Sequence, residues 1–232
     1  MKERPIIFNG AMVRAILSGQ KTQTRRAMKR QPPERWSPVT LSSEPDLHAR
    51  TYTQGVVDRD GYLQAGPEVF GVADEEWGAV SPFGQPGDRL WVRETFGSKI
   101  RSVGGTHHEY YAYRASEPGA VKCYDCNGNE LPIRWTPSIH MPRKAARILL
   151  EINDVRVERL NDISERDALA EGVQPEPCDH ARQSCADIGC CGDTARGEFG
   201  FLWQSIYGQE SWEANPWVWV VEFKPINIGE AS

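Results

Sequence analysis

The residues with the clearest chemical potential lie close together between Ile16 and Arg26. This stretch reads Ile-Leu-Ser-Gly-Gln-Lys-Thr-Gln-Thr-Arg-Arg and places Lys21 and Thr24 three residues apart. Burial, or a neighbouring cation such as Arg25, lowers the pKa of a lysine, and a neutral amine can take the proton of a threonine hydroxyl. The arginines can hold an anion. From the residue types alone, a solvent-exposed basic strand after a helix is equally compatible with this stretch.

A short helix is expected immediately before these residues. Asn9 is a good N-cap, and Gly19 is a plausible residue after the last turn. Between them apolar residues recur at helical spacing, namely Met12, Val13, Ile16 and Leu17. The helix would therefore end directly before the reactive residues.

The run after this helix is predicted to be a strand. Strand alternation then puts Thr22 and Thr24 on one face, and Lys21, Gln23 and Arg25 on the other. Lys21 and Thr24 would converge only if the chain bends between them.

The remaining pattern predicts a mainly β fold with peripheral helices (α+β). We expect a single domain over residues 1–232, built as a small β-barrel, with a long loop-rich insertion at about 27–86 and a cysteine-rich loop at about 173–193. Within the insertion, Asp60-Gly61 predicts a hairpin turn. The aromatic residues of the insertion could stack on a base, but anchoring it to the core is the more usual role.

Two segments in the middle of the chain contain further candidate residues. Alternation from Leu90 to Phe96 predicts a strand with Glu94 on its apolar side, where burial would require Lys21 or an arginine as partner. Solvation of Glu94 at the strand end is the alternative. His140 lies in a loop between two prolines, where it could face a ligand or simply bond to backbone.

The C-terminal part predicts helices and a final strand. Alternation changes parity at Asn153-Asp154, which suggests a bulge. Ser164 resembles the start of a capping box and opens a short helix. A second helix is indicated by an apolar stripe that closes near Gly208, and a strand apolar on both faces follows from Trp217 to Phe223.

Composition limits the classes of function. The net charge of -5 argues against a protein that coats duplex DNA through bulk positive charge, although a small basic pocket remains compatible with it. No apolar run approaches the roughly 20 residues of a membrane span, and no apolar signal segment follows the N-terminal residues. We therefore expect a cytoplasmic protein.

The six cysteines fall into two groups and suggest a structural zinc site. Cys123 and Cys126 form C-x-x-C on a predicted tight turn, which is a common half of a tetrahedral zinc site. The other half could come from a later group that contains Cys178, His180, Cys185, Cys190 and Cys191. Free thiols, or a disulfide within the later loop, are the alternatives.

The sequence resembles the ASCH superfamily, whose small β-barrels are related to PUA RNA-binding domains. The pattern Ile-Leu-x-Gly-x-Lys-Thr-x-Thr carries the local likeness, which is closest to bacterial enzymes that deacetylate 4-N-acetylcytidine. The wider likeness is to prophage-encoded ASCH proteins. It runs through RPIIFNGAMVRAILSGQKTQTRR, GDRLWVRETF, PSIHMPRKAARILLEINDVRVERLNDIS and NPWVWVVEFK.

This resemblance implies an amidohydrolase with a Lys/Thr/Glu site and no catalytic cofactor. Aligning the motif puts the lysine on Lys21 and the nucleophilic threonine on Thr24, and helix position puts the glutamate on Glu171. Glu165 and Glu94 are rivals for the third role. The long insertion and the cysteine loop depart from the small deacetylases, so the substrate stays open.

Two other functions fit the same residues. A non-catalytic RNA or modified-base reader would use Lys21 and the arginines on phosphates and stack a base on an aromatic residue. A ribonuclease would use the same cations to stabilise charge on phosphorus. Across these hypotheses the candidate substrate-binding residues are Thr22, Arg25, Arg26, Glu94, Trp91 and His140.

Overall fold

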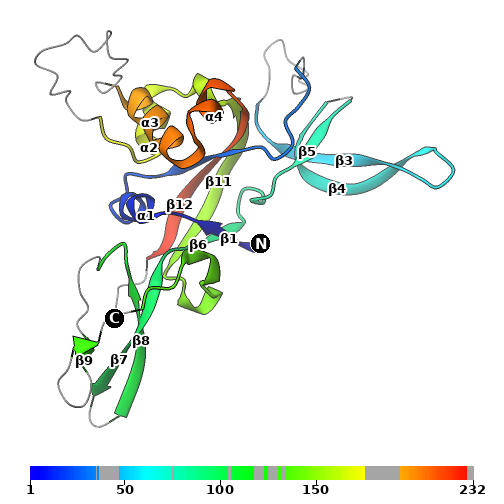
Figure 1. Ribbon diagram of the computed structural model, residues 1–232. Helices are drawn as coiled ribbons and strands as arrows, with labels where there is room; N and C mark the ends of the chain where they lie inside the picture. Colours follow the sequence, from blue (N-terminus) through cyan, green and yellow to red (C-terminus); the bar gives the residue numbers. More distant parts are fainter. Residues whose placement is uncertain are drawn as a thin grey trace, which may run out of the picture. The chain divides into compact units, whose positions relative to one another are not determined.

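The computed structural model is mainly β, with short helices beside the sheets (Figure 1). It describes residues 1–34, 36, 47–74, 76–103, 106–117, 123–124, 130–131, 134–175 and 194–228. The chain forms two compact units. Unit 1 comprises Met1–Gln20, Asp88–Glu151 and Lys224–Ser232, and unit 2 comprises Lys21–Gly87 and Ile152–Phe223.

Unit 1 is built on β1 (Glu3–Ile7), β6 (Arg89–Arg93) and the start of β11 (Ile148–Arg159). β1 runs parallel to β6, and β11 pairs antiparallel with the other edge of β6. Unit 1 also contains α1 (Gly10–Leu17), the paired strands β7 (Phe96–Val103) and β8 (Thr106–Tyr113), the short pair β9 (Cys123–Tyr124) and β10 (Glu130–Leu131), and the 3-10 helices η1 (Ser138–His140) and η2 (Arg143–Ala145).

Unit 2 combines strands with helices. β2 (Gln23–Ala27) pairs antiparallel with β12 (Trp217–Ile228), and β12 neighbours β11. The helical elements are η3 (Leu160–Asp162), α2 (Glu165–Ala170), α3 (Ala195–Tyr207) and α4 (Gln209–Glu213). A separate antiparallel sheet has the order β3 (Arg50–Val57), β4 (Leu63–Ala73) and β5 (Gly78–Val80).

The prediction of a mainly β fold with peripheral helices is confirmed. The strand order is linear, β1-β6-β11 in unit 1 and β11-β12-β2 in unit 2, so no closed barrel is seen in the described ranges. No described helix combines the length and apolar character that crossing a bilayer requires. Whether the two units act as one domain stays a prediction.

Local signals in the sequence place the elements well. The Asn9 side chain accepts a hydrogen bond from the Met12 amide at the start of α1, and Gly19 has φ +76°. The Ser164 side chain caps α2 through the Asp167 amide. Along β11 burial changes parity between Ile152 and Val155, as the sequence pattern indicated.

The insertion is more ordered than the sequence predicts. Its Pro and Gly residues suggested loops, yet β3, β4 and β5 form a sheet. The predicted hairpin is confirmed, with Val57 opposite Leu63 and Gly61 at φ +88° in the turn. Trp36 packs edge-on against Trp77 and against Trp217, with 5.0 Å between the ring centroids in each pair. These aromatic residues therefore anchor the insertion within unit 2.

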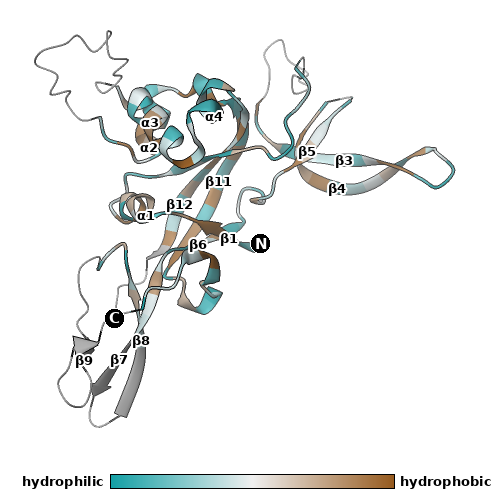
Figure 2. Cartoon of the chain, in the orientation of Figure 1, coloured by the Kyte–Doolittle hydropathy of each residue, from teal (hydrophilic) through white to brown (hydrophobic). Residues whose placement is uncertain are grey.

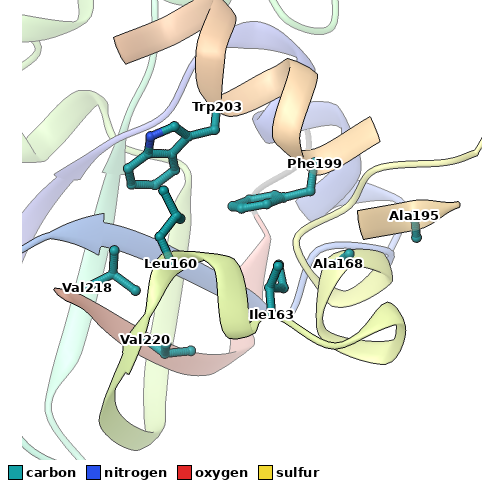
Figure 3. Close-up of a cluster of buried hydrophobic side chains, with 8 residues drawn as sticks. All are labelled: Leu160, Ile163, Ala168, Ala195, Phe199, Trp203, Val218 and Val220. Atoms are coloured by element: carbon teal, nitrogen blue, oxygen red, sulfur yellow. The ribbon is translucent and has the colours of Figure 1, made fainter. Parts of the chain in front are cut away.

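A cluster of buried apolar side chains packs α3 onto β12 in unit 2 (Figure 3). Phe199 and Trp203 on α3 are each 3% exposed, and Val218 and Val220 on β12 are fully buried. Apolar residues recur along β12 (Figure 2), which is the pattern of a strand covered on both faces. The remaining members are Leu160, Ile163, Ala168 and Ala195. This cluster fixes α2, the helix that precedes the candidate site.

Replacing Phe199 by alanine tests this packing. We expect Phe199→Ala to lower the free energy of unfolding by about 3–5 kcal/mol, because it leaves a cavity in the cluster. Phe201→Ala is the matched control, since Phe201 lies on the same helix and is 45% exposed; its effect should stay within about 0.5 kcal/mol. Urea unfolding measures both. Equal losses would contradict the assignment of the core.

Candidate functional site

Lys21 is a buried cation two residues before β2 begins. Its side chain is 0% exposed, and its Nζ donates to Glu171 Oε2 at 2.6 Å and to the Glu171 backbone carbonyl at 2.8 Å. Glu171 is the C-cap of α2, and the Thr22 amide donates to the neighbouring Ala170 carbonyl at 2.8 Å. A cation at the negative end of a helix is favourable. Lys21 and Thr22 therefore satisfy the last carbonyls of α2.

Glu171 is held by two cations at once. Its side chain is 3% exposed; Oε2 accepts from Lys21, while Oε1 accepts from Arg25 Nη1 at 3.4 Å. The turn after α2 continues through Gly172, whose φ of +86° suits a residue without Cβ. The carboxylate is thus fixed by its helix, by the turn and by a different partner on each oxygen.

Arg25 connects this pair to other carboxylates. Its side chain is 0% exposed, and its Nη2 donates to Glu158 Oε2 at 2.7 Å and to Asp167 Oδ2 at 3.3 Å. Its Nε is buried and has no hydrogen-bond partner among the described residues. Arg25 was predicted to bind substrate, but its guanidinium is occupied by three carboxylates of its own chain.

A further arginine, which sequence reasoning missed, extends the network. Arg156 on β11 donates to Glu158 at 2.5 Å and also bonds to Glu222 on β12. The sequence carries a signal for this, because Arg156 and Glu158 alternate with buried Val155 and Val157 and must share the polar face of the strand. The sequence does not reveal which partners they meet.

Burial dominates the electrostatics of Lys21. It lowers the pKa of the amine below 10.5, because the charged form loses its hydration, and Arg25 and Arg26 lower it further; Glu171 opposes the shift. The net direction is downward. A larger fraction of neutral amine is therefore present at any given pH than for an exposed lysine.

Thr24 is buried at 1% exposed, in a continuous register with β12 opposite Val221. Strand alternation puts it on the opposite face of β2 from Gln23 and Arg25, which both contact α2 or its C-cap. Lys21 contacts the same C-cap, so the predicted common face of Lys21, Gln23 and Arg25 agrees with these contacts. The nucleophilic role of Thr24 stays a prediction.

The other predicted binding residues are distributed over both units. In unit 2, Arg26 donates to the Tyr207 hydroxyl at 3.1 Å, and Thr22 is exposed. In unit 1, Trp91 is partly exposed on β6 and His140 is exposed in η1. Glu165, one rival for the catalytic glutamate, accepts from the amides that begin α3.

Glu94 is buried in unit 1 and paired with an arginine. Arg147 donates to both carboxylate oxygens, at 2.9 and 3.0 Å, and its guanidinium lies 4.1 Å from the ring centroid of Tyr113. Of the two partners that the sequence suggested for Glu94, the structure shows the arginine. This pair ties the end of β6 to the segment before β11.

The predicted zinc site lies outside the described residues. Cys123 falls in β9, but its side chain, and all of Cys126, Cys178, Cys185, Cys190 and Cys191, are beyond the part of the chain that is described. Within the described part, no group of His, Cys, Asp and Glu side chains is arranged to hold a metal ion. Metal analysis of the purified protein separates a zinc site from free thiols.

Comparison with known proteins finds no relative of this chain. No family model, curated protein or solved structure matches this chain.

Replacing Glu171 by glutamine tests the electrostatic coupling between Lys21 and Glu171. We expect Glu171→Gln to lower the pKa of Lys21 below its wild-type value, because the charge that opposes desolvation is removed. Carbon-13 NMR of labelled lysine side chains across a pH titration measures it. Asp167→Asn is the control, since Asp167 bonds to Arg25 and Arg156 but not to Lys21. A rise in the pKa of Lys21 would contradict the arrangement.

The pH dependence of stability gives a second test. Because the folded-state pKa of Lys21 lies below the unfolded value, the unfolded chain binds more protons between the two values. The free energy of unfolding contributed by Lys21 therefore rises with pH up to about 10.5. Urea unfolding at a series of pH values from neutral upward measures the free energy of unfolding of wild type and of Lys21→Met. The value for wild type should rise relative to that of Lys21→Met as the pH increases. A difference that shrinks with pH would show that the pKa of Lys21 is raised.

Proposed function

We propose that this protein is an amidohydrolase of the ASCH, PUA-like type that removes an acyl group from a modified cytidine. The observation that carries the proposal is the fully buried Lys21 amine, whose Nζ lies 2.6 Å from Oε2 of the Glu171 carboxylate. Perturbed, buried ionisable pairs are enriched at catalytic sites. The motif Ile-Leu-x-Gly-x-Lys-Thr-x-Thr supports the same assignment from the sequence.

The pair can supply both a base and an acid. Neutral Lys21 takes the proton of the nucleophile, and the carboxylate of Glu171 steers the proton to the departing amine. Arg25 makes this feasible, because its bond to the second Glu171 oxygen balances the carboxylate charge when Lys21 is neutral.

The motif assigns the nucleophile of this proposal to the hydroxyl of Thr24. Because Thr24 lies on the opposite face of β2 from Gln23 and Arg25, the proposal requires a local rearrangement of the strand that brings this hydroxyl to Lys21 when substrate binds. The hydroxyl attacks the acyl carbonyl, the C–N bond to the cytosine amine breaks, and water then hydrolyses the acyl-threonine ester to free acid and threonine. Since the side chains of Lys21 and Arg25 are 0% exposed, substrate reaches the amine only when covering residues move aside. Opening is therefore a step of the proposed cycle.

Release of acetate from 4-N-acetylcytidine tests the proposal. We expect turnover by wild type and a fall in kcat/KM of at least about 100-fold in both Lys21→Met and Thr24→Val, the size associated with losing a base or a nucleophile. Thr53→Val is the matched control, because Thr53 is an exposed threonine on β3. Far-ultraviolet circular dichroism checks that each variant is folded.

Each other result has a defined meaning. Full activity in Thr24→Val, with loss in Lys21→Met, would replace the threonine by water as nucleophile. Absence of acetate release by wild type from acylated cytidines would refute the enzyme assignment and leave the buried pair as a structural cap of α2. Shortening of single-stranded RNA in a parallel incubation would favour a ribonuclease.

A further inference from the structure

β3 forms one edge of the three-stranded sheet in unit 2 (Figure 1). β4 pairs with one side of β3 from Arg50 to Val57. On the other side, the chain just before β3 pairs with β11, where the Ala49 amide donates to the Val155 carbonyl at 2.8 Å. Among the described strands, none continues this pairing beyond Ala49. The outer edge of β3 from Thr51 to Val57 is therefore open to a further strand.

The register assigns the backbone groups at this open edge. The Phe70 carbonyl accepts from the residue after β5 at 2.9 Å, so Phe70 faces β5, and Thr51, which lies opposite it, faces away from β4. At the far end, the Asp58 amide donates to the Tyr62 carbonyl at 2.9 Å, so the preceding Val57 also faces away from β4. The residues that present their N–H and C=O groups at the open edge are Thr51, Thr53, Gly55 and Val57.

This edge lacks the features with which proteins usually protect an exposed strand, namely proline, charge or a bulge. Between Arg50 and Asp58 the chain reads Thr-Tyr-Thr-Gln-Gly-Val-Val, which favours a strand and contains neither charge nor proline. The outer edge of β4, in contrast, contains Pro67, and the register shift puts the extra residue of a bulge on β4. The protection of only one side of the hairpin indicates that the β3 edge pairs with a further strand.

The open edge is complementary to a second copy of itself. Antiparallel pairing about a two-fold axis at Gln54 places Thr51 opposite Val57 of the partner subunit and Thr53 opposite Gly55 of the partner subunit. All the outward-facing residues then fall in hydrogen-bonded pairs, since their parity matches. The open segment ends where β11 pairing begins on one side and where the hairpin turn begins on the other, so both copies use the same length of strand.

Charge favours the same register. It places Arg50 opposite Asp58 of the partner subunit, and the two-fold axis repeats this opposite-charge pair at the other end. The Gln64 side chain and the Tyr62 amide donate to Asp58, and these bonds lower the pKa of its carboxyl below 3.8. Residues 50–65 contain two arginines and two aspartates, so the hairpin carries no net charge that would repel a second copy.

Apolar side chains are exposed along this edge. Val56 and Val57 are 44% and 64% exposed. In the same register Tyr52 lies opposite Val56 of the partner subunit, and an aromatic residue opposite a β-branched one stabilises an antiparallel pair. Pairing therefore removes from water apolar surface that a single chain leaves exposed.

We propose that two copies of this chain associate by antiparallel pairing of their β3 strands about a two-fold axis at Gln54. The three-stranded sheets of the two copies then form one continuous sheet. The proposal does not rest on the amidohydrolase activity, because neither Lys21 nor Glu171 belongs to this sheet.

Sedimentation velocity of the full chain over a concentration series tests the association. We expect wild type to form a reversible dimer. Thr51→Pro removes an N–H that faces the open edge and leaves the pairing with β4 intact. Each dimer then loses two hydrogen bonds, so association should weaken about 5- to 150-fold.

Ala65→Pro is the matched control for the proline variant. Ala65 lies on β4 opposite Gly55, so its N–H faces the other edge of the same hairpin. This variant should dimerise like wild type. Far-ultraviolet circular dichroism checks that both proline variants are folded.

A cysteine at the two-fold axis tests the register and does not depend on the proline variant. Gln54 faces its own copy in a non-hydrogen-bonded pair, where the Cα atoms lie about 4.5 Å apart, within the range of a disulfide. Gln54→Cys should therefore crosslink two chains on mild oxidation, and mass spectrometry should find the peptide around position 54 linked to its own copy. Val56→Cys is the control, since Val56 faces Tyr52 of the partner subunit. Wild type, with six cysteines, gives the background.

Three results would overturn the proposal. The first is a wild-type monomer at every concentration. The second is an equal loss of association in folded Thr51→Pro and Ala65→Pro, which would place the contact elsewhere. The third is a crosslink through position 56 instead of position 54, which would exclude this register. None of these results bears on acetate release, which is measured separately on a free nucleoside.

Discussion

The need to compensate a buried ammonium organises unit 2. An ammonium without water is costly, so Lys21 requires a carboxylate, and that carboxylate comes from a residue 150 positions later in the chain. Satisfying Lys21 therefore requires α2 to end beside the start of β2. Arg25, four residues after Lys21, bonds to the second oxygen of the same carboxylate and to Glu158 and Asp167. These bonds hold β2, α2 and β11 together.

Much of the local structure could be read from the sequence because its causes are local. Caps at Asn9 and Ser164, the Asp60-Gly61 turn and the apolar stripe of α3 each depend on residues within a few positions. The shared face of Lys21, Gln23 and Arg25 follows from the two-residue period of a strand. These features need no knowledge of the rest of the fold.

What the sequence could not predict depends on distant pairing. The sheet within the insertion is formed by contacts between strands that composition alone presents as loop, and Trp36 anchors it through residues far along the chain. The pairing of Glu94 with Arg147 spans 53 residues. The pairing of Lys21 with Glu171 was reached only through a family resemblance, since no periodic pattern links the two positions.

The continuity of β11 and β12 across the boundary between the units affects how the protein is made. Both strands begin in one unit and end in the other, and unit 1 takes its last segment from Lys224 onward. On the ribosome, neither unit can complete its set of strands until β12 has emerged. Cotranslational folding should thus stop at partial sheets, which expose unpaired strand edges to chaperones until β12 is available.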